Sequence, residues 1–205
     1  VFPLTTKQFG SLSRPKPCVN STTANVVEDN GVRYLVHQTN IDTNAIVIYF
    51  HGNRGIADQQ LYFARHCDAQ DMTLVLPEYP GYGEQTRFRW VTMDTIVDNM
   101  VKVFQHVQKF VNHDDKPIIV IGRSLGTMVA LKTIARLDDV MQRKIQKVML
   151  VSPFMSVNDV AANMTNIPKP LLSLAMPMHC NISDEAITIQ NLRKTTFDST
   201  QFCIV

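Results

Sequence analysis

A serine lies between two glycines in the segment Ile119–Leu131, where a run of β-branched residues gives way to a helical pattern. A serine hydroxyl attacks a carbonyl carbon only when a base removes its proton and donors stabilise the negative charge on the carbonyl oxygen. A sharp strand-to-helix turn exposes such a hydroxyl, and residues two positions away on either side must then be small. The spacing therefore predicts that Ser124 is a nucleophile and that Gly122 and Gly126 make room for the turn.

The groups that would stabilise the oxyanion are backbone N–H groups near this serine. Leu125 follows the nucleophile directly and opens a helix, whose N-terminus favours negative charge. The second donor is expected from the backbone N–H of Asn53 in "HGNRG", which reaches the same edge of the sheet. Within that segment we expect His51 to be a hydrogen-bonded scaffold residue. The aromatic turn "PEYPGYG", residues 77–83, is expected to shape the pocket.

The elements that must position these residues alternate between buried strands and amphipathic helices. A hairpin with an Asn-Gly turn comes first. Farther along the chain, Thr92 or Asp94 is expected to cap the helix Asp94–Val111. The expected strands are Val26–Glu28, Val32–His37, Ala45–Phe50, Thr73–Pro77, Ile118–Gly122, Val148–Ser152 and the closing "QFCIV", and the expected helices are Ala57–Ala69, Asp94–Val111 and Leu125–Leu137. This alternation predicts an α/β fold with a mostly parallel sheet and helices on both faces.

Composition limits the classes of function. The 205 residues carry a formal net charge of +2 without a dense basic block, which gives no reason to expect nucleic acid as a partner. No uninterrupted apolar run is long enough for a membrane span, and the isolated cysteines favour a reducing compartment, so a cytoplasmic protein is expected. The four cysteines are isolated and form no metal-binding pattern, so no metal site is expected.

The order of "HGNRG", "PEYPGYG", "GRSLG" and "VSPF" resembles the serine-hydrolase branch of the α/β-hydrolase fold, especially its thioesterase and monoacylglycerol-lipase-like members. The resemblance covers the chain from about Val26 onward. It implies one hydrolase domain over residues 1–205, with a small lid-like insertion at 153–200. It also implies cleavage of acyl esters or thioesters through an acyl-enzyme on Ser124, without a cofactor. Lipid esters, palmitoyl-proteins and peripheral membrane contact are within the range of that resemblance.

The acid and the histidine of the triad are not evident at their usual places. In that family they follow the strand after the lid and the last strand, so both positions would lie beyond Val205. We therefore expect that the last strand and helix of the domain are missing and that the exposed sheet edge favours self-association. Asp159 and His179 form an alternative triad with Ser124 in the required order. His179, however, lies in an irregular segment where no sheet edge holds it near the serine.

Two other functions remain open from the sequence. A catalytically incomplete fragment or pseudoenzyme would act as a lipid-binding or protein-binding module. A nucleotide-binding α/β domain would need a glycine-rich phosphate loop after a strand, and none is present.

Arg123 either receives an anionic substrate or forms an ion pair at the rim of the site. Met176 and Met178 either line an acyl channel or pack the insertion onto the sheet.

Overall fold

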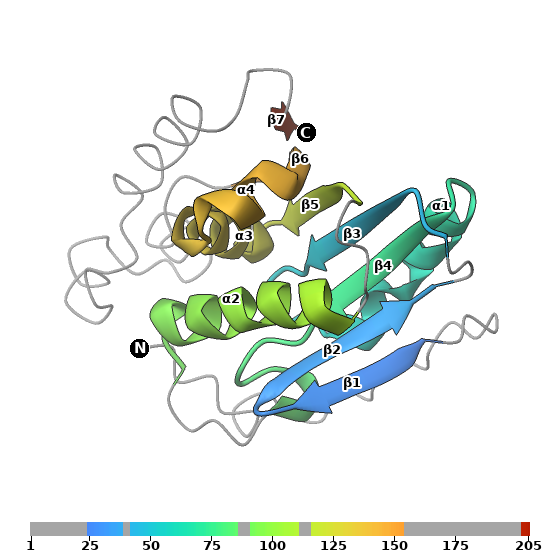
Figure 1. The fold of residues 1–205 in the computed structure, drawn as a ribbon. Coiled ribbons are helices and arrows are strands. Elements are labelled where there is room, and N and C mark those ends of the chain that lie inside the picture. The colour runs from blue at the N-terminus through green and yellow to red at the C-terminus, as the bar shows by residue number, and fades with distance from the viewer. Residues whose placement is uncertain (1–23, 39–41, 86–90, 111–115, 154–201) are drawn as a thin grey trace.

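The protein is built around one mixed β-sheet, which Figure 1 shows with helices in front of it and behind it. A computed structural model describes residues 24–38, 42–85, 91–110, 116–153 and 202–205. The seven strands in these ranges are β1 (Asn25–Asp29), β2 (Val32–His37), β3 (Ala45–Phe50), β4 (Met72–Pro77), β5 (Ile118–Arg123), β6 (Ile145–Val151) and β7 (Phe202–Ile204).

The strands are arranged in the order β1-β2-β4-β3-β5-β6-β7. The first two pairs, β1 with β2 and β2 with β4, are antiparallel, whereas all later pairs are parallel. This confirms the predicted fold class and the mostly parallel sheet. Because β3 and β5 are parallel neighbours in the middle of the sheet, the loops that follow them leave from the same edge.

The inner strands are apolar on both faces because each face is covered. Residues of β3 alternate between the two sides: Ile46 and Ile48 contribute to the core under α2 and α3, whereas Val47 and Tyr49 contribute to a second core under η1 and α1. All six residues of β3 are buried. This explains why β3 reads as a continuous hydrophobic run rather than an alternating one.

The helices differ more from expectation than the strands do. The structure has η1 (Ala57–Phe63), α1 (Ala64–Asp68), η2 (Gly83–Gln85), α2 (Met93–Phe110), α3 (Leu125–Arg136) and α4 (Asp139–Lys144). The helix expected at 57–69 is therefore a 3₁₀ segment followed by a short α-helix. The short helix α4 was not predicted, and β6 begins before the expected position.

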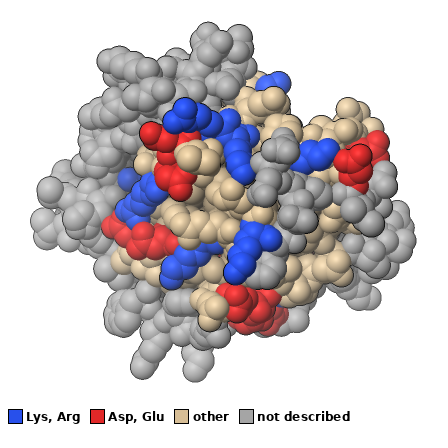
Figure 2. Space-filling model, in the orientation of Figure 1, with Lys and Arg blue, Asp and Glu red and all other residues tan. Residues whose placement is uncertain are grey.

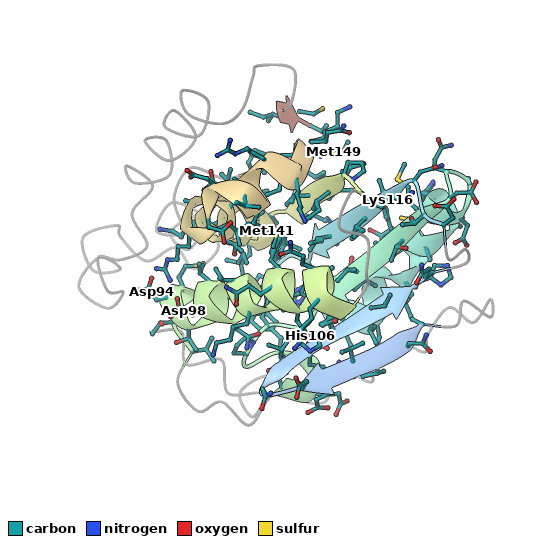
Figure 3. The ribbon with its side chains drawn as sticks, in the orientation of Figure 1. Asp94, Asp98, His106, Lys116, Met141 and Met149 are labelled. Atoms are coloured by element: carbon teal, nitrogen blue, oxygen red, sulfur yellow. The ribbon has the colours of Figure 1, made fainter. Side chains whose placement is uncertain are left out.

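Capping and ion pairs fix the ends of the helices on one face of the sheet. Thr92 is the cap of α2, because its Oγ1 accepts a hydrogen bond from the N–H of Thr95 at 3.1 Å. Asp94 instead forms an ion pair with Arg136 at the end of α3, and Asp98 binds the same guanidinium at 2.6 Å. Asp94 and Asp98 are labelled at one end of α2 in Figure 3. These contacts tie the start of α2 to the end of α3.

The hairpin turn also agrees with the sequence. Asn30 and Gly31 both have positive φ, at 47° and 80°, as the tightest hairpin turns require. Tyr34 of β2 contacts His106 of α2, with 2.7 Å between the tyrosine hydroxyl and Nδ1 of the histidine. The hairpin is thereby joined to the helix layer as well as to the sheet.

Several expectations fall on residues outside the described ranges. Of the insertion expected at 153–200, the structure describes only Pro153. Asp159, His179, Met176 and Met178 all lie outside the described residues, so their predicted roles remain predictions. In the described ranges, no helix combines the length and the apolar composition that a membrane span requires.

Charged residues on the described surface are mixed in sign. On the face shown in Figure 2, Lys and Arg side chains are interspersed with Asp and Glu side chains and do not form one continuous basic surface. Nor do the described His, Cys, Asp and Glu residues include a group of three or more arranged to hold a metal ion.

Candidate functional site

Ser124 is the junction between β5 and α3, and its backbone is strained. Its φ and ψ angles are 50° and −118°, in a region that residues with a side chain rarely adopt. Its N–H is held by the carbonyl oxygen of Val151 on β6 at 2.9 Å. Serine at the first position before a helix usually caps it, but the Ser124 side chain makes no capping hydrogen bond. The hydroxyl is therefore not used by the helix.

The glycines on either side of this serine are required by close backbone contacts. A Cβ atom on Gly122 would lie 2.6 Å from the carbonyl oxygen of Gly126, and one on Gly126 would lie 2.1 Å from the carbonyl oxygen of Phe50. Real Cβ atoms do not approach backbone atoms so closely. The two glycines thus allow β5, α3 and the end of β3 to pack closely around Ser124. This close packing is the reason, expected from the sequence, that small residues flank the serine.

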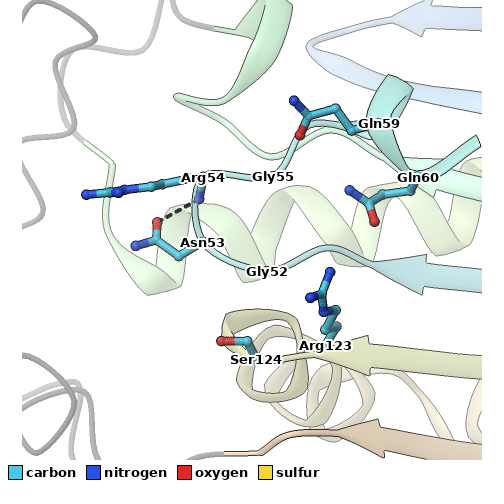
Figure 4. Close-up of a pocket in the computed structure, with 8 residues that line it drawn as sticks. All are labelled: Gly52, Asn53, Arg54, Gly55, Gln59, Gln60, Arg123 and Ser124. Carbon is cyan, nitrogen blue, oxygen red and sulfur yellow. Dashed lines mark hydrogen bonds between the residues drawn. The ribbon is translucent and has the colours of Figure 1, made fainter. Parts of the chain in front are cut away.

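The turn after β3 forms the opposite wall of a pocket beside Ser124. We call residues 52–55 the β3 turn. A Cβ atom on Gly52 would lie 3.3 Å from the carbonyl oxygen of Arg123 and 3.4 Å from Cβ of Ser124, so this turn lies against the junction. Between them is a pocket of about 330 Å³, shown in Figure 4. Its side chains include those of Asn53, Arg54, Gln59, Gln60, Arg123 and Ser124.

The pocket brings together three of the residues that the sequence singled out, Asn53, Arg123 and Ser124. Ser124 and Asn53 both line it, and Leu125 is the first residue of α3. The N–H groups of the first helical turn have no carbonyl partner within their own helix, so the Leu125 N–H is not used by α3. Arg123 is exposed and lines the same pocket. In Figure 4 its guanidinium points toward Gln60.

His51 precedes the β3 turn and is fully buried. Its Nδ1 lies 2.9 Å from the carbonyl oxygen of Gly52, so Nδ1 carries the proton and donates it. Burial lowers the pKa of His51 to about 4, which keeps the ring neutral near pH 7. In the described part of the chain, Ser124 Oγ has no hydrogen bond to a histidine. His51 is therefore a hydrogen-bonded scaffold residue, as expected from the sequence.

The buried carboxyl group of Glu78 lies next to His51 and to the start of η1. Glu78 accepts hydrogen bonds from the N–H of Ala57 at 3.2 Å and from the guanidinium of Arg33 at 3.1 Å. One of its oxygens lies 3.9 Å from Nε2 of His51. Burial raises the pKa of Glu78 to about 7, although the Ala57 N–H and Arg33 act in the opposite direction. The buried side chains next to the β3 turn thus include a cluster formed by Arg33, Glu78 and His51.

Some contributors to the site were not evident from the sequence. The segment "PEYPGYG" was expected to shape the pocket, but its tyrosines do not line the described pocket. They contact the β3 turn from outside it: Tyr79 donates to the carbonyl oxygen of His51 at 2.9 Å, and Tyr82 donates to Oδ1 of Asn53 at 3.0 Å. The only sequence signal for these contacts was the repeated aromatic-glycine pattern of the turn.

Comparison with known families identifies the architecture. A family model described as "Serine aminopeptidase, S33" matches residues 41–194. No curated protein matches the chain. The chain is similar to the structure of a soluble variant of monoglyceride lipase from Saccharomyces cerevisiae in complex with a substrate analogue. That similarity has a TM-score of 0.59 and 14% identity, and covers 79% of this chain and 55% of the lipase.

Two esterases show the same fold. A thermostable carboxyl esterase from Bacillus coagulans is 12% identical over 88% of this chain and 68% of its own, with a TM-score of 0.56. Est1E from Butyrivibrio proteoclasticus, bound to ferulic acid, is 16% identical over 68% of this chain and 57% of its own, with a TM-score of 0.55. The fold is that of the α/β-hydrolases, and the chain spans about half the length of the lipase it matches (55%).

Proposed function

The chain belongs to the serine aminopeptidase S33 family of hydrolases, and on that premise we propose that it is a serine hydrolase acting on acyl esters or thioesters, with Ser124 as the nucleophile. The observation that carries the proposal is the conformation of Ser124. A serine held at φ 50° between two sterically required glycines, with a side chain that does not cap the following helix, has a strained backbone without a structural benefit of its own. Such strain is typical of reactive residues.

In the proposed mechanism Ser124 Oγ attacks the carbonyl carbon of the substrate. A base takes the hydroxyl proton, and the electron pair of the carbonyl bond moves onto its oxygen. The N–H groups of Leu125 and Asn53 donate hydrogen bonds to this oxyanion. Collapse of the intermediate expels the alcohol or thiol, which receives the proton, and leaves an acyl group on Ser124. Water then attacks the acyl-enzyme and releases the carboxylic acid.

The base is the part of this mechanism that the described residues do not supply. His51 is buried, neutral and bonded to Gly52, and it makes no hydrogen bond to Ser124. His179 with Asp159, or groups beyond Val205, remain the two proposals for the base and the acid. Without a base, the oxyanion donors and substrate binding retain only a fraction of the catalytic power of a serine hydrolase.

The substrate is proposed from the class of reaction and from the resemblance to lipase-like and thioesterase-like proteins. Lipid esters and palmitoyl-proteins are the proposed candidates. The two arginines and two glutamines around the pocket add a polar component beside the nucleophile. Such side chains can bind the polar part of an ester while its acyl chain lies elsewhere.

A fluorophosphonate probe tests the proposal directly, because it reacts with an activated serine. We expect labelling of the full product of the gene at Ser124, and loss of labelling in Ser124→Ala. Ser152→Ala is a matched control, since Ser152 also has φ of 50° and is exposed at the end of β6. Labelling that is absent in the wild type, or equally lost in Ser152→Ala, would contradict the proposal.

A non-catalytic binding module is the alternative that the same experiment addresses. It is favoured by the absence, among described residues, of a hydrogen bond between Ser124 and a base. In that case the probe would leave Ser124 unlabelled, whereas lipid vesicles or acyl-chain ligands would still raise the melting temperature of the chain. Labelling of Ser124 would exclude this alternative.

A further inference from the structure

The β3 turn is hydrogen-bonded to the loop that follows β4. We call residues 78–85 the β4 loop. Three hydrogen bonds join the β4 loop to the β3 turn and to residues on either side of it: Tyr79 hydroxyl to the His51 carbonyl at 2.9 Å, Tyr82 hydroxyl to Asn53 Oδ1 at 3.0 Å, and the Ala57 N–H to Glu78 Oε1 at 3.2 Å. The contacts lie before, within and after the β3 turn. A loop that is far away in sequence thus contacts the turn at Asn53 and the chain just before and just after it.

The turn needs this support because its backbone is strained at Arg54. Arg54 has a φ of 62°, a left-handed conformation that costs a non-glycine residue roughly 1 kcal/mol. Within the turn, the N–H of Gly55 binds the carbonyl oxygen of Gly52 at 3.1 Å, and the N–H of Arg54 binds Asn53 Oδ1 at 3.1 Å. Figure 4 shows the latter bond as a dashed line. The side-chain oxygen of Asn53 therefore stabilises the strained residue directly.

Asn53 Oδ1 is also the atom to which the Tyr82 hydroxyl donates. One oxygen thus accepts from Arg54 inside the turn and from Tyr82 outside it. If Tyr82 is absent, the Asn53 side chain is held by only one of these two bonds and can rotate. Rotation would release Arg54 from its left-handed conformation and would move the backbone on either side of Asn53.

The Tyr82 hydroxyl is itself held in place. Its ring packs edge-on against Tyr79, with centroids 5.5 Å apart, and lies 5.4 Å from the ring of His51. Gly81 and Gly83 on either side have positive φ, and a Cβ on Gly81 would lie 2.6 Å from a methyl group of Val91. Burial raises the pKa of Tyr82 to about 12, so the hydroxyl remains a donor over the whole physiological range.

We propose that Tyr82 is a positioning residue for hydrolysis: by donating to Asn53 Oδ1, it holds the β3 turn in the conformation in which the Asn53 N–H can stabilise the oxyanion. This inference rests on the proposed function, since it assigns a purpose to one donor of that site. Tyr82 acts through Asn53 and does not touch the substrate. Its role is distinct from that of Tyr79, which binds the backbone before the turn.

The test compares Tyr82→Phe with a matched control, Tyr62→Phe. Tyr62 is half-exposed, and its hydroxyl lies 3.4 Å from that of Tyr49, which is not a residue of the β3 turn. In the full product of the gene, with p-nitrophenyl butyrate as substrate, we expect Tyr82→Phe to lower kcat about tenfold with little change in KM, because an oxyanion donor acts mainly in the transition state. Tyr62→Phe should leave both constants near the wild-type values.

A double-mutant cycle separates positioning from general destabilisation. Asn53→Ala removes the oxygen through which Tyr82 acts, so the Asn53→Ala/Tyr82→Phe double variant should be no slower than Asn53→Ala alone. Asn53→Asp keeps an acceptor oxygen and should retain the dependence on Tyr82. Strictly additive losses, or a kcat of Tyr82→Phe equal to that of the wild type, would overturn the proposal.

Amide hydrogen exchange gives a readout that does not depend on activity. Tyr82→Phe should accelerate exchange at Arg54 and Gly55, which form the hydrogen bonds of the β3 turn, while Tyr62→Phe should not. If no variant hydrolyses the ester but exchange responds as expected, the proposed function fails and the control of the turn by Tyr82 stands. Unchanged exchange at both residues would overturn the inference even in an active enzyme.

Discussion

Gly126 lies so close to the end of β3 that a side chain on it would occupy the position of the Phe50 carbonyl group: the distance from an added Cβ to that oxygen would be 2.1 Å. Gly126 is in the first turn of α3, and Phe50 is opposite Gly122 in the register of β3 and β5. The helix therefore packs directly onto the backbone of the neighbouring strand. The hydroxyl of Ser124 and the turn that carries Asn53 are brought together by this contact.

Substitution of Gly126 by alanine should therefore be strongly destabilising. The added methyl group would contact backbone atoms that cannot rotate away, so we expect a loss of about 3 kcal/mol or more in the free energy of unfolding. Gly52→Ala is the matched control, since its nearest neighbours would lie at 3.3 Å and 3.4 Å. Urea denaturation of both variants measures the difference, and equal losses would contradict the packing described.

Substitutions of Ser124 should distinguish the effect of backbone strain on stability from the reactivity of the hydroxyl group. Glycine adopts positive φ without a Cβ penalty, whereas alanine does not. We expect Ser124→Gly to be about 1 kcal/mol more stable than Ser124→Ala, and both to lose labelling by a fluorophosphonate. Thermal denaturation compares the two variants. An alanine variant as stable as the glycine variant would show that the backbone at residue 124 carries no strain.

The buried pair of Glu78 and His51 predicts two opposite dependences of stability on pH. Burial raises the pKa of Glu78 from 4.5 to about 7, so its contribution to stability is complete below pH 4.5 and is lost as the pH rises to about 7. Burial lowers the pKa of His51 from 6.5 to about 4, so its contribution is complete above pH 6.5 and is lost as the pH falls to about 4.

Single substitutions should reveal each contribution by difference from the wild type. Relative to the wild type, Glu78→Gln should gain about 3 kcal/mol in unfolding free energy as the pH rises from 4.5 to 7. His51→Gln should gain a similar amount, about 3 kcal/mol, as the pH falls from 6.5 to 4. Urea denaturation at a series of pH values measures both. Differences that do not change with pH would exclude these assignments.

Arg123 offers a test of its two sequence-derived roles. Two arginines line the pocket beside Ser124, and no Asp or Glu does so among the described residues. We expect Arg123→Gln to lower kcat/KM for a p-nitrophenyl monoester of glutaric acid about fivefold more than for the neutral valerate ester. Arg136→Gln, at the end of α3, is the control. Equal effects on both esters would favour a purely structural ion pair at the rim.

The strands and the strand-to-helix junction at Ser124 were predictable because their signals are local. Val47 and Ile48 belong to an uninterrupted apolar run, which is typical of a strand covered on both faces. Gly122 and Gly126 flank Ser124 at the spacing that a strand-to-helix turn requires, and the structure shows the backbone contacts that explain them. These features depend on a few neighbouring residues, so the sequence contains them directly.

The remaining features are either too short to show a periodic pattern or depend on contacts between distant residues. The segment expected as one helix from Ala57 begins as a 3₁₀ helix, and the Ala57 N–H binds Glu78, which is 21 residues away. The contact of Tyr82 with Asn53 spans 29 residues and requires the folded positions of both loops. The helix α4 has only six residues and is stabilised by the cap at Asp138. No periodic pattern of apolar residues reveals such short or long-range features.

The central location of β3 and β5 has a consequence for how this scaffold tolerates change. The hairpin of β1 and β2 lies at one side of the sheet and β7 at the other, whereas β3 and β5, which lead into the loops with Asn53 and Ser124, are adjacent inner neighbours. The spacing of the two loops is therefore set by the pairing of β3 with β5 and not by the outer strands. We therefore expect changes at the edges of the sheet to leave the dimensions of the proposed site unchanged.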